Sequence, residues 1–199
     1  LLVSLWLGPV CAAILLACGL AAVAHGVSNV TVTNTDDSGA GSLRQAIADA
    51  ASGDTIVFDA AVFSVPQTIT LASELAVDKN LTIDGAAGGV VTPTISGPGA
   101  ACGTCFRVFT ITGAEVTLNR LAIVNGKVGA PQFGGGINSS GNLTVANSLV
   151  TGNVATMNGG GIAVNAPGFL TLIDTAVVSN VANGFGGGAY ANAAASVSG

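Results

Sequence analysis

One short pattern recurs three times in the last third of the chain: Gly134-Gly135-Gly136-Ile137, Gly159-Gly160-Gly161-Ile162 and Gly186-Gly187-Gly188-Ala189. Strand-like triplets between these glycine blocks repeat in step, as Val116-Thr117-Leu118, Leu143-Thr144-Val145 and Leu170-Thr171-Leu172. Each triplet begins 27 positions after the one before it, and the glycine blocks are spaced 25 and then 27 apart. A repeat of this length is one turn of a solenoid, which buries its apolar face only against the next turn. The pattern therefore predicts stacked coils rather than a compact enzyme fold.

The triplets alternate apolar residues with threonine, which indicates strands with one buried face. The apolar positions are expected to point inward and to stack one turn apart: Leu143, Val145, Leu170 and Leu172. Their partners Thr144 and Thr171 are expected to point outward. A further aligned position, also expected to face outward, holds Arg120, Asn147 and Asp174.

Asparagine recurs at the same period. Asn153 and Asn180 lie 27 positions apart, just after the second strand-like stretch of each repeat. Asparagine tolerates left-handed backbone geometry at corners, and stacked amide side chains hydrogen-bond along a ladder. We expect both features here, and we expect the glycine blocks to lie at corners where a Cβ would clash.

Ahead of the repeats the sequence predicts one helix, over Ser42–Ala51. Ser42 is a plausible N-cap, and Gln45 three residues later completes a capping-box pattern. Gly53 is well placed to stop the helix. One face is apolar at helical spacing, with Leu43, Ala46, Ile47 and Ala50. We expect this face to seal the first coil at the N-terminal end of the solenoid, covering an edge that would otherwise pair with other chains.

The other predicted segments are short, β-branched and bounded by Gly, Asn, Asp or Pro. They are Val30–Thr33, Thr55–Phe58, Thr68–Leu71, Leu81–Gly85, Thr94–Gly97 and Val108–Ile111. No second amphipathic helix is predicted, which excludes a doubly wound sheet. A β-sandwich would not explain the fixed period. The prediction is one all-β domain over residues 25–199, a parallel β-helix of roughly six or seven turns.

The composition and charge of the chain limit the kinds of partner that it can bind. Half of the 199 residues are hydrophobic and 8% are charged, which is little charge for a soluble surface. The net charge is −5, and the five basic residues are scattered: Arg44, Lys79, Arg107, Arg120 and Lys127. Because a phosphate-binding surface needs a basic patch, no nucleic-acid partner is expected.

Residues 1–24 carry no formal charge and end in Ala22-Val23-Ala24, a small-x-small pattern suited to signal peptidase. We expect them to be a signal peptide that lacks its start, with the mature chain beginning near His25. One alternative is a transmembrane anchor, since the run is nearly long enough to span a bilayer, although Gly8-Pro9 favours a cleaved signal. A second is a lipoprotein signal at Cys18, for which Leu16 is a bulky neighbour.

Cys11 and Cys18 fall in this leader, and the other two cysteines form Cys102-Gly103-Thr104-Cys105. In an exported chain that spacing suits a disulfide across a turn, with two free thiols as the structural alternative. A thioredoxin-like redox pair would need a βαβ context, and a zinc site would need a second Cys or His pair. The sequence offers neither.

The stretch Gly41-Ser42-Leu43-Arg44-Gln45-Ala46-Ile47, followed by Gly53-Asp54-Thr55-Ile56-Val57-Phe58, resembles the N-terminal CSLREA-type segment of bacterial surface β-helix proteins. Gly41 replaces the family's Cys, and Gln45 replaces its Glu. The Gly-Gly-Gly-Ile repeats are similar to those of chlamydial polymorphic outer membrane proteins. The resemblance covers nearly everything from Val30 onward, and it identifies architecture and export better than ligand.

The resemblance implies a right-handed parallel β-helix exported to the cell surface, often as an adhesin or an autotransporter passenger. In this chain the N-terminal cap motif would be Ser42, Leu43, Arg44, Gln45 and Ile47. We expect Val197 to begin the next repeat's strand, since it lies 27 positions after Leu170. The sequence then reads as a fragment of a longer solenoid, whose outer-membrane association would depend on a C-terminal region not included. The expected role is structural or adhesive, with a surface protein, a glycan or a second copy as the ligand.

Parallel β-helices also house pectin lyases and polygalacturonases, so a carbohydrate-active enzyme is the alternative function. Asn34-Thr35-Asp36 matches the Asn-Thr-Asp signature of polygalacturonases, but no Asp-Asp, Gly-His-Gly or Arg-x-Lys follows to complete the set. Glycoside hydrolysis needs two carboxylates facing one bond, and folding could bring Asp59, Asp84 and Glu115 onto one flank. Apart from that possibility, the aspartates are expected to be turn formers or solvated charges: Asp49, Asp54, Asp59, Asp78, Asp84 and Asp174. The sequence names no catalytic residue, no metal site and no cofactor.

Overall fold

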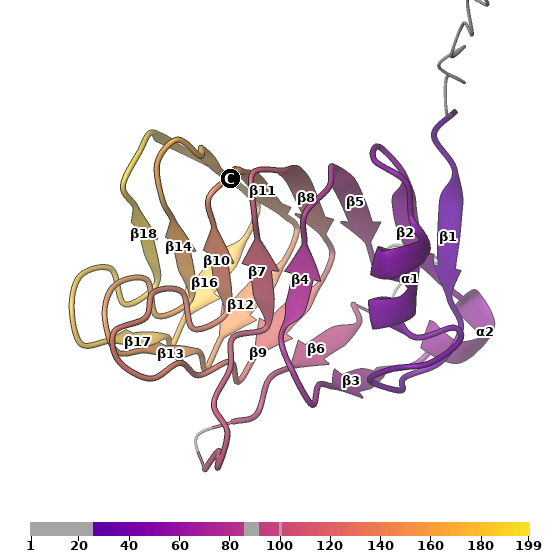
Figure 1. Ribbon diagram of the computed structural model, residues 1–199, viewed down its shortest axis with the longest axis horizontal. Helices are drawn as coiled ribbons and strands as arrows, with labels where there is room; N and C mark the ends of the chain where they lie inside the picture. Colours follow the sequence, from indigo (N-terminus) through magenta and orange to yellow (C-terminus); the bar gives the residue numbers. More distant parts are fainter. Residues whose placement is uncertain (1–25, 86–91, 100) are drawn as a thin grey trace, which may run out of the picture.

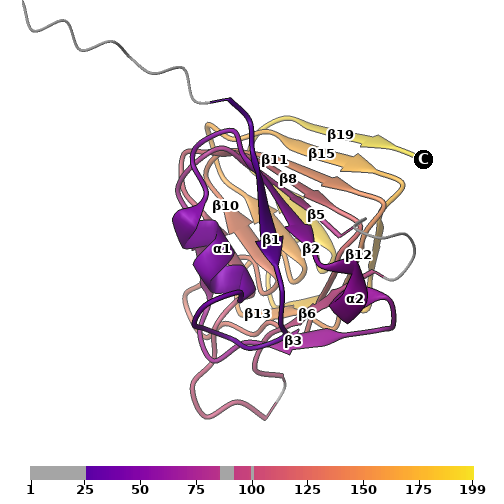
Figure 2. The ribbon, with the colours of Figure 1, turned by 90° about the vertical axis from the view of Figure 1, so that its right-hand side faces the viewer.

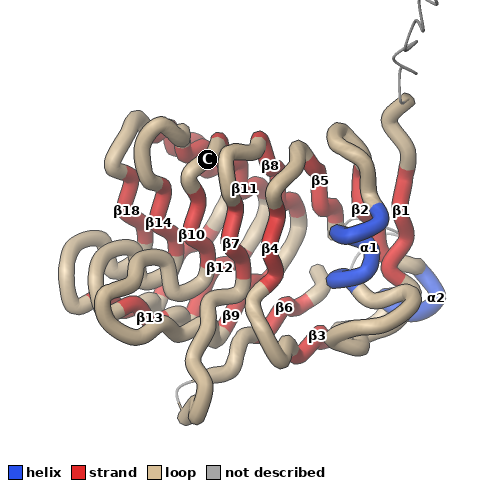
Figure 3. The backbone as a smooth tube through the Cα atoms, in the orientation of Figure 1, coloured by secondary structure: helices blue, strands red, loops and turns tan. Residues whose placement is uncertain are grey.

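The computed structural model describes residues 26–85, 92–99 and 101–199. Almost all of its strands are parallel and stack into a β-helix, with the glycine-rich coils at one end and two short helices at the other (Figures 1 and 3). The predicted signal peptide and His25 lie outside the described residues.

Sheet A is the longest of the four sheets, with seven strands. In spatial order they are β1 (Asn29–Val32), β2 (Thr55–Phe58), β5 (Leu81–Asp84), β8 (Glu115–Asn119), β11 (Asn142–Ala146), β15 (Leu170–Ile173) and β19 (Ala195–Ser198). Leu143 pairs in parallel with Val116 on one side and with Leu170 on the other. The predicted 27-residue register is confirmed for these coils.

Two five-stranded sheets form the other main faces. Sheet B contains β3 (Thr68–Thr70), β6 (Thr94–Ser96), β9 (Ala122–Val124), β12 (Leu149–Thr151) and β16 (Ala176–Val178). Sheet C contains β4 (Leu75–Val77), β7 (Phe109–Ile111), β10 (Ile137–Ser139), β14 (Ile162–Val164) and β18 (Ala189–Ala191). A small sheet D pairs β13 (Val154–Ala155) with β17 (Val181–Ala182).

The chain passes from sheet A to sheet B, then to sheet C, and back to sheet A one coil further on. Seen from the N-terminal end, this path runs clockwise as it recedes (Figure 2). The β-helix is therefore right-handed, as predicted, and the seven strands of sheet A bound six coils.

The interior is a continuous stack of aliphatic and aromatic side chains. Leu143 and Val145 are buried there, as predicted, together with Leu170 and Leu172 one coil further on. Sheets B and C contribute further fully buried side chains, among them Ile95, Ile123 and Phe109. Each coil thus covers the apolar face of its neighbour.

Helix α1 (Leu43–Asp49) lies beside β4, at the N-terminal end of sheet C (Figure 1). Its predicted apolar face is buried, with Leu43, Ala46, Ile47 and Ala50 each at most 5% exposed. The prediction that the helix covers an edge holds for sheet C, whereas β1 forms the outer strand of sheet A.

Both predicted ends of the helix need correction. Ser42 Oγ accepts a hydrogen bond from the Gln45 N–H (3.1 Å), but Gln45 Nε2 donates to Asp49 Oδ1 (2.7 Å) instead of returning to Ser42. Only half of the predicted capping box forms. The helix ends at Asp49 because Ala50 is already extended, and Gly53 lies in the following turn, where it donates to the Asn80 carbonyl (2.7 Å).

A second helix, α2 (Ala60–Phe63), was not predicted from the sequence. Asp59 caps it, since Asp59 Oδ1 accepts from the Ala61 N–H at 2.7 Å. Phe63 is buried, and its ring meets Phe58 edge-on with centroids 4.9 Å apart. Four residues are too few to produce a helical period, so only the aspartate cap signals this turn.

The glycine blocks lie where the chain enters sheet C. In the first two blocks a Cβ would clash with neighbouring backbone, as predicted. A Cβ on Gly135 would meet the carbonyl oxygens of Val154 and Gly160, and a Cβ on Gly160 would meet those of Val181 and Gly187. The third block is looser. A Cβ on Gly187, the equivalent position, would lie 3.1 Å from the Asn180 carbonyl oxygen, and one on Gly188 would lie 3.3 Å from Val177 Cγ1. Neighbouring coils therefore pack backbone against backbone at this corner.

The asparagine ladder forms as predicted. Asn153 is fully buried, and its Nδ2 donates to the carbonyl oxygens of Ile123 (3.0 Å) and Thr151 (3.1 Å) and to Asn180 Oδ1 (3.0 Å). Its Oδ1 accepts from the Gly126 N–H at 2.8 Å. The amide thus supplies partners that the corner backbone would otherwise lack.

The left-handed corner residue is not the ladder asparagine, as the sequence suggested, but the residue before it. Its φ is +69° at Gly152, before Asn153, and +53° at Ser179, before Asn180; in the preceding coil it is +61° at Asn125, where Gly126 holds the ladder position. Another left-handed corner, between sheets A and B, holds Arg120, Asn147 and Asp174, with φ of +54°, +50° and +45°. These three side chains are exposed, as predicted.

The coil between β15 and β19 is shorter than the sequence predicted. Leu170 pairs with Ala195, 25 positions on, and Val197 lies opposite Leu172. The prediction that a strand begins at Val197 is therefore wrong by two residues. No residue of β19 repeats the leucines of the earlier strands, so the sequence does not mark this shift.

Candidate functional site

The outer face of sheet A carries a continuous column of hydroxyl side chains. Six consecutive strands place one in register with the next: Thr55, Thr82, Thr117, Thr144, Thr171 and Ser196. Neighbouring strands lie about 4.8 Å apart, which sets the step of the column. The sequence predicted Thr144 and Thr171 on this face, and the register extends them into what we call the hydroxyl column.

A shallow groove runs beside the hydroxyl column, at the corner where sheet C leads into sheet A. It consists of two cavities of about 380 Å³ and 180 Å³ that share Asn80 and Glu115. We call it the corner groove. Its polar lining consists of Asn80, Thr82, Glu115, Thr117, Ser140 and Asn142.

One row of residues borders the corner groove, with one member from each of four successive coils. Glu115 pairs with Asn142, and the adjoining registers place Asn80 before Glu115 and Phe169 after Asn142. Asn80 Oδ1 accepts from the Glu115 N–H (2.9 Å), and Asn142 Oδ1 accepts from the Phe169 N–H (3.1 Å). The amide oxygens therefore fix the next coil, while the Nδ2 groups have no acceptor among the described residues.

Phe169 ends this row as an exposed aromatic residue. It follows Gly168, which lines the corner groove, and 38% of its surface is exposed. The sequence analysis did not single it out, although its 27-residue offset from Asn142 was the available signal. Exposed aromatic side chains beside polar grooves provide contact area at low conformational cost.

The corner groove carries little charge. Among the described residues that line it, Glu115 is the only charged one. Lys79, adjacent to Asn80, points instead to the end of α1, where Nζ donates to the carbonyl oxygens of Ala48 (3.2 Å) and Ala50 (3.0 Å). The groove is therefore polar and weakly negative.

Of the three carboxylates proposed for one flank, Glu115 lies away from Asp84, whereas Asp59 stands two residues beyond Val57, the strand partner of Asp84. Asp84 and Glu115 lie at opposite ends of neighbouring strands, since Asp84 pairs with Asn119 at the far end of β8. Glu115 and Asn119 are four positions apart, which along a strand corresponds to about 13 Å. Asp59 serves as the cap of α2. Asp54 belongs to the turn before β2, as expected of a turn former. It is 2% exposed and accepts from the backbone N–H groups of Ser28 (2.9 Å) and Ala51 (2.8 Å).

The Asn-Thr-Asp tripeptide forms a turn before α1. Asn34 Oδ1 accepts from the Asp36 N–H (3.1 Å), and Asn34 Nδ2 donates to the Ala40 carbonyl (2.8 Å). This is the local bonding of an Asx turn. Its polar atoms serve the loop that leads into the helix.

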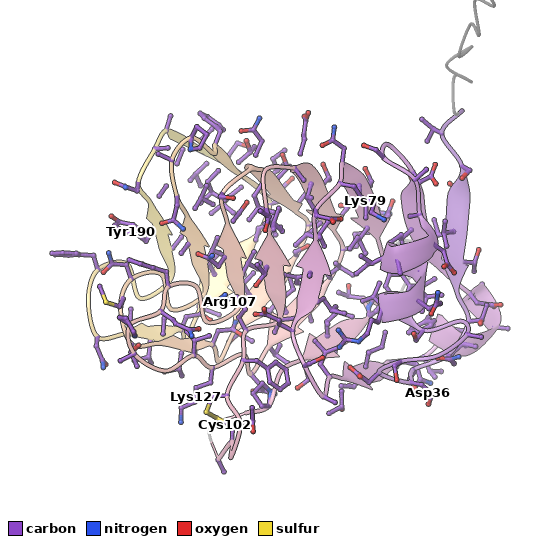
Figure 4. All side chains as sticks on the ribbon, viewed as in Figure 1. Asp36, Lys79, Cys102, Arg107, Lys127 and Tyr190 are labelled. Carbon is purple, nitrogen blue, oxygen red and sulfur yellow. A yellow bond between two sulfur atoms is a disulfide. The ribbon has the colours of Figure 1, made fainter. Side chains whose placement is uncertain are left out.

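Cys102 and Cys105 form a disulfide in the structure, with Cα atoms 5.3 Å apart. The disulfide closes a turn near the tip of a loop that projects from the coils between β6 and β7 (Figure 4). This loop stands apart from the corner groove, and the disulfide restrains its outermost residues.

The cap motif is built around Arg44. Its Nη1 donates to the Glu74 carbonyl (2.7 Å), and Nη2 donates to the Ser73 carbonyl (2.8 Å) and to Asp37 Oδ1 (2.6 Å). Burial raises the pKa of Asp37, but the hydrogen bonds from Arg44 and the Ala72 N–H, together with the Arg44 charge, bring this pKa below its ordinary value. Arg44 thus clamps the loop before α1 to the chain entering β4.

Arg107 has a comparable structural role on sheet C. Burial lowers its pKa and the nearby Glu74 opposes that shift, yet a guanidinium stays charged. Its Nη2 donates to Gln132 Oε1 (2.8 Å) and its Nε to the Gly134 carbonyl (3.3 Å). Arg107 therefore holds the loop that carries the first glycine block.

Among the described residues, no three His, Cys, Asp or Glu side chains gather closely enough to hold a metal ion. In the same part of the chain, no helix has the length and apolarity to cross a membrane. No family model, no curated protein and no solved structure matches this chain.

Proposed function

We propose that this chain is an exported β-helix module with a structural and adhesive role, secreted or held at the cell surface. The observation that carries the proposal is the outer face of sheet A, where the hydroxyl column and the corner groove give one long polar flank. In the described structure this flank faces away from the other sheets (Figure 2). Extended solenoid flanks are the binding surfaces that such proteins use.

Export is supported by two independent features. The apolar stretch of residues 1–24 ends in the small-x-small pattern at Ala22-Val23-Ala24. The Cys102–Cys105 disulfide suits an oxidising compartment, because cytosolic thiols are kept reduced. The resemblance to CSLREA-type and polymorphic outer membrane proteins points the same way and adds adhesion as the expected activity.

The structure gives little support to the enzymatic alternative. Catalysis of glycoside cleavage needs two preorganised carboxylates across one bond. Asp84 and Glu115 lie at opposite ends of neighbouring strands, and the Asp59 carboxylate is engaged as the cap of α2. We therefore propose adhesion rather than polysaccharide cleavage.

The test is a binding assay with the purified full chain, labelled with a fluorophore and applied to bacterial cells, host cells and immobilised matrix components. We expect saturable binding to at least one surface, reduced by Thr144→Arg on the hydroxyl column. The matched control is Thr151→Arg, the same substitution on the outer face of sheet B. Absence of binding across all the surfaces, or equal binding by both variants, would contradict the assignment to this flank.

A further inference from the structure

We propose that the corner groove binds a neutral linear glycan that lies along the axis of the β-helix. This inference deepens the proposed adhesive function and rests on it. The ligand class follows from three features, which are the hydrogen-bonding groups of the groove, the exposed Phe169 beside it and its charge.

The hydrogen-bonding groups of the groove suit the hydroxyls of a sugar. Asn80 and Asn142 are exposed, and their Nδ2 groups have no acceptor among the described residues. They are held in place because their oxygens bind the backbone of the next coil. Glu115 is also exposed and supplies acceptor oxygens between them. Fixed donors and acceptors are what a sugar hydroxyl, which both donates and accepts, requires.

Phe169 provides the apolar contact. It stands one coil beyond Asn142 in the same row, held by the hydrogen bond from its N–H to Asn142 Oδ1. A pyranose ring presents C–H groups on its face, and an exposed aromatic ring is the side chain that packs best against such a surface. The combination of one aromatic residue with a few convergent polar groups is typical of small-ligand sites.

The charge of the groove selects against acidic polysaccharides. Glu115 would repel a uronate or sulfate chain, and none of the five basic residues lines the groove to offset it. The net charge of −5 acts in the same direction at longer range. The charge therefore favours an uncharged ligand over a pectin-like one.

The repeat sets the orientation of the ligand. Successive coils present their polar groups about 4.8 Å apart, which is the spacing of neighbouring strands. That step is close to the length of one pyranose unit in an extended chain. A linear glycan along the axis would meet one set of groups per sugar, from Asn80 to Phe169, whereas a chain across the coils would meet only one set.

The experiment is affinity electrophoresis of the purified full chain in native gels that contain one polysaccharide each. The neutral probes are hydroxyethyl cellulose, galactomannan and glycol chitin, and the acidic probe is polygalacturonate. We expect retardation by at least one neutral probe and none by polygalacturonate. Retardation by polygalacturonate alone, or by none of the four, would overturn the proposal.

Two phenylalanines provide the matched comparison. Phe169→Ala is expected to weaken binding about tenfold, the loss that corresponds to one aromatic contact. Phe185→Ala removes a more exposed phenylalanine, 76% exposed, from a loop outside the groove and should leave binding unchanged. Equal binding by Phe169→Ala and the unaltered chain would overturn the proposal, and circular dichroism of both variants verifies that the fold is retained.

A second pair tests the charge argument. Glu115→Gln keeps the size but loses the charge and one acceptor oxygen, so neutral-probe binding should weaken, though less than in Phe169→Ala. Glu115→Lys should add retardation by polygalacturonate, because the groove then carries a positive charge. If the chain adheres to cells but no neutral probe retards it, the glycan inference fails while the adhesive function stands. If it binds a neutral probe but no cell surface, the adhesive function fails and the glycan site stands.

Discussion

Arg44 and Asp37 form an ion pair, with Nη2 and Oδ1 2.6 Å apart, that ties α1 to the loop before it. Both side chains are mostly buried, at 27% and 23% exposure. The same guanidinium also satisfies the carbonyls of Ser73 and Glu74. One side chain therefore fastens the N-terminal cap to the coils.

Replacing this arginine should loosen the cap. Arg44→Ala leaves two carbonyls and the Asp37 carboxylate without their charged donor, and we expect a loss of about 2 kcal/mol in the free energy of unfolding. Arg44→Lys should recover only part of it, since an ammonium lacks the planar fork. Urea unfolding followed by circular dichroism measures both. The control is Arg120→Asn, which gives an exposed corner the residue that the next coil carries as Asn147, and an equal loss there would refute a special role for Arg44.

The lowered pKa of Asp37 predicts a pH dependence. A carboxyl with a lower pKa in the folded state contributes stability above its unfolded pKa, about 3.9, and loses it as the pH falls through the folded value. The difference in unfolding free energy between the unaltered chain and Asp37→Asn should therefore be constant from neutral pH to about 5 and should shrink below about 4. Urea titrations at a series of pH values decide the matter, and a difference that grows toward acid pH would contradict the sign.

The buried ladder asparagine should be among the most sensitive positions. Asn153→Ala would leave the Gly126 N–H and the carbonyls of Ile123 and Thr151 without their partner, at a cost of about 3 kcal/mol or more. Asn180→Ala should cost less, because Asn180 is only partly buried. Thermal and urea unfolding of the two variants compare them. A larger loss of stability at Asn180 would mean that burial of the asparagine does not determine the size of the loss.

Two glycines that look alike in the sequence should respond differently to alanine. Gly160→Ala would push a Cβ into the carbonyl oxygens of Val181 and Gly187, and we expect a loss of about 3 kcal/mol. A Cβ on Gly188 would lie 3.3 Å from Val177 Cγ1 and 3.4 Å from the Val177 carbonyl oxygen, so Gly188→Ala should change stability by less than about 1 kcal/mol. Chemical unfolding of the pair tests this contrast. Similar losses would show that coil spacing adjusts to a methyl group.

The proposed leader yields a direct measurement. If residues 1–24 form a signal peptide, N-terminal sequencing of secreted material should begin near His25. Recovery of an intact Leu1 in a membrane fraction would instead support the anchor alternative.

The sequence predicted the coils best where residues repeat at a constant interval. Leu143 and Leu170 share a triplet pattern, so their parallel pairing follows directly. The cap helix was also predictable, because Leu43, Ala46 and Ile47 have helical spacing. The partners of Arg44 were not predictable, because hydrogen bonds to the carbonyls of Ser73 and Glu74, 29 and 30 residues away in the segment before β4, leave no periodic signal.

The corner groove could not be predicted from the sequence, because its residues come from coils of unequal length and only the strand register brings them together. Asn80 and Glu115 lie side by side although 35 residues separate them, whereas Glu115 and Asn142 are 27 apart. Only the paired strands place these side chains in one row. For the same reason, the separation of Asp84 from Glu115 could not be obtained from sequence spacing.

The unequal coils also bear on how such a chain can change its length. Ten positions separate Asp84 from Thr94, but only three separate their partners Asn119 and Ala122. The longer connection leaves Thr82 and Thr117 in register within the hydroxyl column. Additional residues at this crossing therefore leave the pattern of the flank intact. The crossing between sheets A and B is thus a natural place for evolutionary insertions, or for the display of a grafted peptide epitope.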